Sequence, residues 1–155
     1  VAHNASSEHT GGRLRAATWF ARIAFLLAFV INVQCALQFA LNPADFAGAY
    51  ELSGVAGEAA IRGLGIAFLM WNATYPAFIV APQRFRVLGW VILAQQAIGL
   101  IGESLLLVGL PAGHDVLTAS VMRFVAFDAV GLVLMSAAFA CLLVVYERNV
   151  LEYGA

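Results

Sequence analysis

The chain has 155 residues and a formal net charge of −1; 63% of its residues are apolar or aromatic, and only 11% are charged. This composition excludes a water-soluble globular domain, in which about a quarter of the residues are charged. It also argues against nucleic acid as a partner, because there is no basic stripe to neutralise phosphates. A membrane-spanning helix needs about 20 mostly apolar residues, so the chain has room for four spans.

The first segment, residues 1–12, is small, polar and without apolar periodicity. We predict a disordered tail there, ahead of a single membrane domain over residues 13–155. The segment lacks the apolar run of a secretory signal, so we expect the first hydrophobic stretch to be a retained span.

Four apolar stretches follow, and proline and glycine mark most of their ends. The predicted spans are residues 16–41, 57–80, 87–110 and 117–146. Proline removes a backbone donor and disfavours helix before it, so the spans are expected to stop at Pro43, Pro82 and Pro111. Only helices and closed barrels satisfy their backbone in lipid, and no alternating pattern of about ten residues suggests a barrel. The sequence therefore predicts an all-α integral membrane four-helix bundle.

Arginine placement predicts the orientation of this bundle, because the chain has no lysine. Six arginines fall on the side shared by the N-terminus, the loop between the second and third spans, and the C-terminus: Arg13, Arg15, Arg22, Arg84, Arg86 and Arg148. The opposite loops carry Asp45, Glu51 and Asp115 instead. The positive-inside rule therefore predicts that both termini are cytoplasmic.

The cysteines and histidines argue against two classes of site. Cys35 and Cys141 fall in opposite halves of the membrane, so they cannot pair within one chain, and there is no C-x-x-C dithiol motif. His3, His9 and His114 fall in the tail or a loop, so no span offers an imidazole to haem or to a metal cluster. We therefore expect neither a cofactor nor a metal ion.

Polar side chains within the spans are the candidates for a binding site. They are costly in a bilayer, so they usually face the bundle interior and pair. The candidate ligand-binding residues are Gln34 in the first span, Glu58, Arg62 and Asn72 in the second, Gln96 and Glu103 in the third, and Arg123 and Asp128 in the fourth. The small residues Ala59, Gly63 and Ala67 are expected to mark close helix approach instead.

Two interpretations of these residues stay open. In the first they are interhelical contacts that hold the bundle together. In the second, Arg62 and Arg123 hold an anionic or carbonyl-bearing head group in a cavity open to the extracytoplasmic side, balanced by nearby carboxylates. Glu58 and Arg62 lie four residues apart and can therefore pair along the helix. Arg123 and Asp128 lie about 140° apart around a helix, so they cannot both point at one spot.

Two stretches of the chain resemble a known group. The sequence AIRGLGIAFL over residues 60–69 resembles the opening of the second span in DoxX-like small four-span bacterial membrane proteins. RVLGW at residues 86–90, followed by GLIGE at 99–103, is similar to their third span, so the likeness covers about residues 50–110. The resemblance implies a bundle in the bacterial cytoplasmic (inner) membrane, sometimes associated with quinone-linked systems, and it singles out Arg62 and Glu103.

Three functions stay open at this stage. The favoured one is a protein that binds a membrane lipid, a quinone or a small amphiphile, or docks as an accessory subunit on a larger membrane complex. The second is a small transporter or channel, which would need a homo-oligomer because the inner halves of the spans are almost wholly apolar. The third is an enzyme with Glu103 or Asp128 as proton carrier. Against catalysis stands the lack of a nucleophile paired with a base.

Overall fold

The protein is described by a computed structural model of residues 2–153, with side chains over residues 11–151. Within that range the backbone forms helices and turns, and no strand. The helices are α1 (Ala2–Leu41), α2 (Ala44–Ala47), the 3-10 helix η1 (Gly48–Tyr50), α3 (Gly54–Asn72), α4 (Tyr75–Val80), α5 (Arg86–Gly109) and α6 (Asp115–Tyr153). Four segments are long and apolar enough to cross a membrane: Gly11–Leu41, Gly54–Val80, Arg86–Gly109 and Asp115–Leu151. This confirms the prediction of an all-α protein with four helices able to span a membrane.

The N-terminal segment differs from a simple tail in its local geometry. The backbone is helical from Ala2, the first residue of α1, whereas the part of α1 that is able to span a membrane begins at Gly11. Val1 lies outside the described residues. Disorder of residues 1–12 in solution stays a prediction. At the other end, α6 continues about two turns beyond the predicted limit of residue 146.

The second span is interrupted, which was not anticipated from the sequence. α3 ends at Asn72 and α4 begins at Tyr75, with a turn over residues 73–74 between them. The cause is Pro76, which has no N–H to donate to the carbonyl of Asn72 and whose ring would clash with that carbonyl in a continuous helix.

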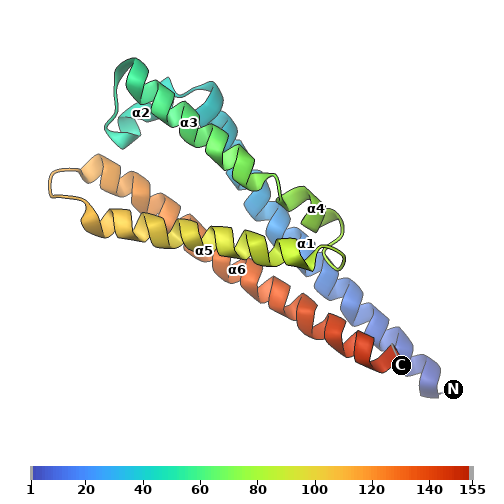
Figure 1. Ribbon diagram of the computed structural model, residues 1–155. Helices are drawn as coiled ribbons and strands as arrows, with labels where there is room; N and C mark the ends of the chain where they lie inside the picture. The colour runs from blue at the N-terminus through green and yellow to red at the C-terminus, as the bar shows by residue number, and fades with distance from the viewer. Residues whose placement is uncertain (1, 154–155) are drawn as a thin grey trace.

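The long helices form an open arrangement rather than a closed ring. α1 packs against both α3 and α6, and α5 packs against α6. Figure 1 shows α3 and α5 diverging toward the end of the bundle that lies away from the chain termini. On the side of the termini, α4 contacts both α1 and α5 and closes the bundle. The Pro76 break therefore determines where the bundle is closed.

α1 and α3 approach each other closely at Gly65. An added Cβ there would lie 2.6 Å from the backbone oxygen of Ala36 and 2.6 Å from the backbone nitrogen of Ala40. The predicted contact residues of α3 were wrong: Ala59 and Ala67 are exposed, and a Cβ on Gly63 would meet nothing within 4 Å. The small-residue spacing was the right kind of signal, but it was assigned to the outward face of α3.

Two clusters of buried side chains lie at different heights in the bundle. The terminal-side core draws on α1, α4, α5 and α6 and contains Ala21, Ala24, Phe25, Ala28, Tyr75, Phe78, Ile92, Leu93, Met135, Ala138, Phe139 and Leu142. The loop-side core has only three buried members, Phe39, Ala47 and Ile61, with partly buried aromatic rings packed around them. Polar side chains occupy the level between these two cores.

Candidate functional site

Side chains from all four spans line one small cavity between the two cores. The lining residues are Asn32 of α1, Phe68, Trp71 and Asn72 of α3, Gln96 and Glu103 of α5, and Phe124 and Asp128 of α6. The cavity has a volume of about 30 Å³, which is enough for one or two water molecules. It is a polar site with aromatic walls, set inside an otherwise apolar bundle.

The polar side chains of this cavity are only partly paired, and two of their oxygen atoms have no hydrogen-bond partner. The Gln96 side chain, 2% exposed, donates from Nε2 to Asp128 Oδ1 at 2.7 Å. The Asn72 side chain, 4% exposed, donates from Nδ2 to the carbonyl of Phe68 at 2.8 Å. Among the described side chains, Asn72 Oδ1 and Glu103 Oε2 are buried and accept no hydrogen bond. Buried polar atoms are normally paired, so these two acceptor oxygens mark the cavity as incomplete without a donor.

The break between α3 and α4 lies beside this cavity. Asn72 is the last residue of α3, and Thr74 Oγ1 in the following turn lies 3.4 Å from the Trp71 carbonyl and 3.5 Å from Gln95 Oε1. Within a membrane, non-helical backbone is tolerated only where protein or a polar cavity surrounds it. The interrupted helix and the cavity therefore belong to one structural feature.

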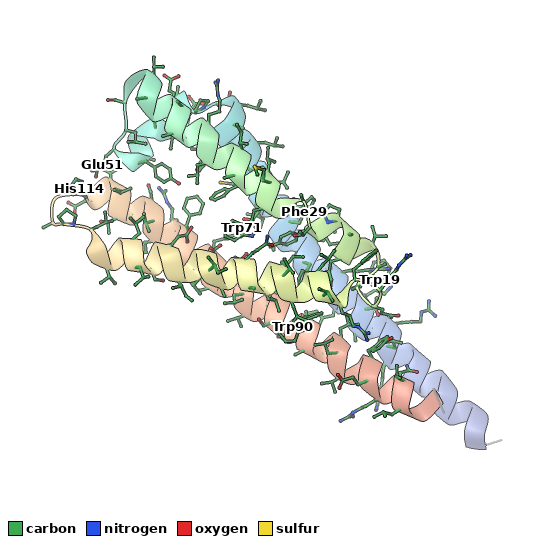
Figure 2. The ribbon with its side chains drawn as sticks, viewed as in Figure 1. Trp19, Phe29, Glu51, Trp71, Trp90 and His114 are labelled. Atoms are coloured by element: carbon green, nitrogen blue, oxygen red, sulfur yellow. The ribbon has the colours of Figure 1, made fainter. Side chains whose placement is uncertain are left out.

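Trp71 forms the wall between the polar cavity and an apolar groove. The groove has a volume of about 400 Å³ and lies between α3 and α5, where Trp71 is joined by Ala67, Met70, Gln95 and Ile98. Figure 2 labels Trp71 in the space between these two helices. A Cβ added to Gly99 of α5 would lie 3.0 Å from the Trp71 ring and 2.9 Å from Asp128 Oδ2. A larger residue at this position would force Asp128 or Trp71 to shift.

The structure brings four of the eight predicted site residues together and places the other four elsewhere. Those that line the cavity are Asn72, Gln96, Glu103 and Asp128, and those outside it are Gln34, Glu58, Arg62 and Arg123. The buried face of α3 carries Gly57, Ile61, Gly65 and Asn72. Arg62 follows Ile61 by one residue, about 100° around the helix, and is exposed.

Arg123 occupies a different face of α6 from Asp128, as their spacing predicted. Its guanidinium donates to Ser120 Oγ at 3.0 Å, and it lines an adjoining groove beside Ile31 and Cys35 of α1. That groove shares Asn32 and Phe124 with the cavity, but Arg123 is not among the cavity's lining residues. Among side chains of residues 11–151 no ion pair joins Arg62 or Arg123 to a carboxylate, so the pairing of Glu58 with Arg62 that their spacing allows does not form. The cavity therefore contains two carboxyl groups and no arginine.

Asn32 is a cavity residue that was not selected from the sequence. It continues the buried face of α1, at spacings of three or four residues along Phe25, Ala28, Asn32, Ala36 and Phe39. That periodicity was the available signal. Gln34, which was selected instead, lies two residues on, about 200° around the helix, and is exposed. The aromatic walls had no comparable signal.

Hydrogen bonds join the segment between α1 and α3, the first loop of the bundle, to the start of α6. Glu51 accepts hydrogen bonds from His114 and from the backbone nitrogen of Leu117, the latter at 3.2 Å, and Ser120 Oγ donates to the carbonyl of Ala49 at 2.6 Å. Figure 2 shows Glu51 and His114 close together at the loop end of the bundle. The hydrogen bonds from His114 and Leu117 lower the pKa of Glu51 below its ordinary value.

Comparisons with known proteins identify no relative: no protein family, curated protein or solved structure matches this chain. The DoxX-like resemblance therefore rests on the quoted stretches of the second and third spans alone. Within the described residues, no group of three or more His, Cys, Asp or Glu side chains is placed to hold a metal ion.

Proposed function

We propose that this is an integral membrane protein that binds a small amphiphile, with the polar head in the cavity and the apolar chain in the groove between α3 and α5. The observation that carries the proposal is the pair of buried acceptors without partners, Asn72 Oδ1 and Glu103 Oε2, in a cavity that shares Trp71 with an apolar groove. A layer that served only to join helices would satisfy its polar atoms internally.

The size of the cavity favours a compact head. A cavity of about 150 Å³ accommodates one benzene molecule, whereas this cavity measures about 30 Å³. The aromatic ring of a quinone and a phosphate group are both larger than the available space. The proposal therefore narrows the three sequence-based candidates, lipid, quinone and small amphiphile, to an amphiphile with a small head.

The surroundings of the cavity favour binding over conduction and catalysis. On the terminal side the cavity is followed by rings that are at most 1% exposed, those of Phe25, Tyr75, Phe78 and Phe139. A polar path through a single chain would have to cross them. The lining residues include two carboxyl groups but no Ser, Cys, Thr, Lys or His that could act as a nucleophile.

The orientation with both termini in the cytoplasm of a bacterial inner membrane belongs to the same proposal. It is supported by the arginine distribution. On the terminal side, Arg86 lies 4.0 Å from the ring centre of Tyr146, and Arg22 lies 5.1 Å from that of Trp19. Such pairs suit the level of the lipid head groups. A C-terminal fusion to a fluorescent protein should fluoresce in cells, while a fusion to alkaline phosphatase should be inactive; the reverse result would invert the topology.

Trp71 provides a direct test of the binding site. A protein with Trp19→Phe and Trp90→Phe retains Trp71 as its single tryptophan, and a protein with Trp19→Phe and Trp71→Phe retains Trp90, which is 60% exposed on the outer surface. In lipid nanodiscs, amphiphiles brominated in the chain should quench Trp71 fluorescence saturably at low mole fraction, and quench Trp90 only in proportion to their bulk concentration. Equal, non-saturating quenching of both residues by every amphiphile tried would refute the site.

Two glycines of α5 give a matched pair for the same assay. Gly99→Ala places a methyl group against Asp128 and Trp71, so we expect at least severalfold weaker saturable quenching of Trp71. Gly102→Ala adds a methyl group with nothing within 4 Å and should leave the binding curve unchanged. Equal curves for both variants would show that the ligand does not enter beside Asp128.

A further inference from the structure

The cavity has an unbalanced set of polar groups. Its lining includes the carboxyl groups of Glu103 and Asp128 and the amides of Asn32, Asn72 and Gln96, but no Arg, Lys or His. A charge that is buried in a low-dielectric interior is normally paired with an opposite charge. The arginines of the neighbouring spans do not provide it, because Arg62 and Arg123 are both exposed on other helix faces.

From this imbalance we infer that the bound head group is cationic, a compact ammonium group carried by an amphiphile, and not an anionic or carbonyl-bearing head. The inference rests on the proposed function and specifies its ligand. It reverses the expectation from the sequence, in which two arginines were to hold an anion.

The arrangement of acceptors fits an ammonium group. Gln96 is committed to Asp128 Oδ1, which leaves Asp128 Oδ2, Glu103 Oε2 and Asn72 Oδ1 as acceptor atoms on three different helices. A primary ammonium has three N–H donors and no acceptor. A donor-only head therefore matches a cavity whose buried unpartnered atoms, Asn72 Oδ1 and Glu103 Oε2, are acceptor oxygens, and each bond to a carboxylate is charge-assisted.

The aromatic walls favour the same class of ligand. Phe68, Trp71 and Phe124 line the cavity, and an ammonium group is attracted to the face of such rings. The volume of about 30 Å³ accommodates a primary ammonium but not a phosphate or a sulfate. Charge, hydrogen bonding and size thus point to the same head.

The test compares three head groups on one chain. Dibrominated dodecylamine, dodecanol and dodecyl sulfate are titrated at pH 7 into zwitterionic nanodiscs that hold the protein with Trp71 as its single tryptophan. Losing a charge-assisted hydrogen bond costs about tenfold to a hundredfold in affinity. We therefore expect the amine to half-saturate the quenching at least tenfold below the alcohol, and the sulfate to show no saturable quenching.

Charge-neutralising variants locate the effect. Glu103→Gln and Asp128→Asn keep the side-chain size, and each should reduce the preference for the amine over the alcohol about tenfold. Glu58→Gln is the matched control, because Glu58 lies on α3 outside the cavity and its loss should change nothing. Saturable quenching by the alcohol in each variant reports that the site is folded.

The outcomes separate the inference from the function on which it rests. If none of the three amphiphiles saturates, both fail. If the alcohol or the sulfate binds as tightly as the amine, the amphiphile site stands and the cationic head is overturned. Competition by Na⁺ that N-methylglucamine at equal ionic strength does not reproduce would assign the cavity to an inorganic cation, and would also overturn the ammonium head.

Discussion

The two halves of the bundle are built from the same apolar residue types but packed to different degrees. In the terminal-side core, seven large side chains are at most 1% exposed: Phe25, Tyr75, Phe78, Ile92, Met135, Phe139 and Leu142. The buried members of the loop-side core are Ile61, Phe39 and Ala47, which are 2%, 3% and 5% exposed. The difference follows from α4, which packs against both α1 and α5 on the terminal side. On the loop side α2 packs against α3 and η1 against α6, and neither joins α3 to α5, which diverge there (Figure 1).

This contrast separates the part of the bundle that stabilises the fold from the part that holds the proposed binding site. The closed half can hold the four spans together, so the open half can leave α3 and α5 apart at little cost to the fold. The polar cavity lies where the two halves meet, next to the break that produces α4. A single proline thus contributes to both properties, because it ends α3 and redirects the chain across the bundle.

The largest loss of stability is expected from a substitution in the terminal-side core, which lies in the half of the bundle that α4 closes. Phe25→Ala removes a ring that packs at tilted or edge-on angles against Tyr75, Phe78 and Phe139, and should lower the free energy of unfolding by about 3–5 kcal/mol. Leu26→Ala is the control on the same helix, since Leu26 is 44% exposed on the outside of the bundle and its truncation leaves no internal cavity. Unfolding in mixed detergent micelles, followed by circular dichroism, measures both. Similar losses for the two variants would contradict the packing described for this half.

An intermediate effect is expected where α1 meets α3 in the open half. Gly65→Ala forces a methyl group to 2.6 Å from the backbone of α1, which cannot yield as a side chain would. We expect about 1–3 kcal/mol of destabilisation in the same unfolding assay. Gly63→Ala, two residues away and facing open space, should be neutral. Equal stability of both variants would mean that α1 and α3 do not pack through Gly65.

The smallest effect is expected at the loop end, where Glu51 joins the first loop to α6. The pKa of Glu51 is lowered in the folded protein, so its contribution is complete above its ordinary value of about 4.5 and is lost as the pH falls through the lowered value. Spin labels at Ser53 and Ala112, in a protein with both native cysteines replaced by serine, should give a narrow distance distribution at pH 7. The distribution should broaden in acid below that range.

Glu51→Gln supplies the control for this contact. Glutamine keeps the size of the side chain but loses its charge, so the distance distribution should be broad at neutral pH and insensitive to acid. If the labelled protein that retains Glu51 gave the same distance distribution from pH 7 to pH 3, Glu51 would not hold the loop against α6.

Half of the residues that line the cavity were predictable from the sequence, because they are polar residues within apolar spans. Asn72, Gln96, Glu103 and Asp128 were recognised because polar groups in a span are costly and usually lie inside. The same rule failed for Gln34, Glu58, Arg62 and Arg123, which do not line the cavity. For the two arginines the reason is that a long side chain can reach the water interface from an outward face. Asn32 could have been found by following the periodicity of α1.

The sequence by itself determined the number of apolar helices, their approximate limits at proline and glycine, and the divergence of Arg123 from Asp128. Only the tertiary structure decided which face of each helix is internal and that α3 and α5 stay apart. The physical reason is that lipid is as apolar as a protein core, so hydropathy does not distinguish the two faces of a spanning helix. Rotation about each helix axis is set by close contacts between helices, such as Gly65 against Ala36 and Ala40, and these depend on partners that are distant in the chain.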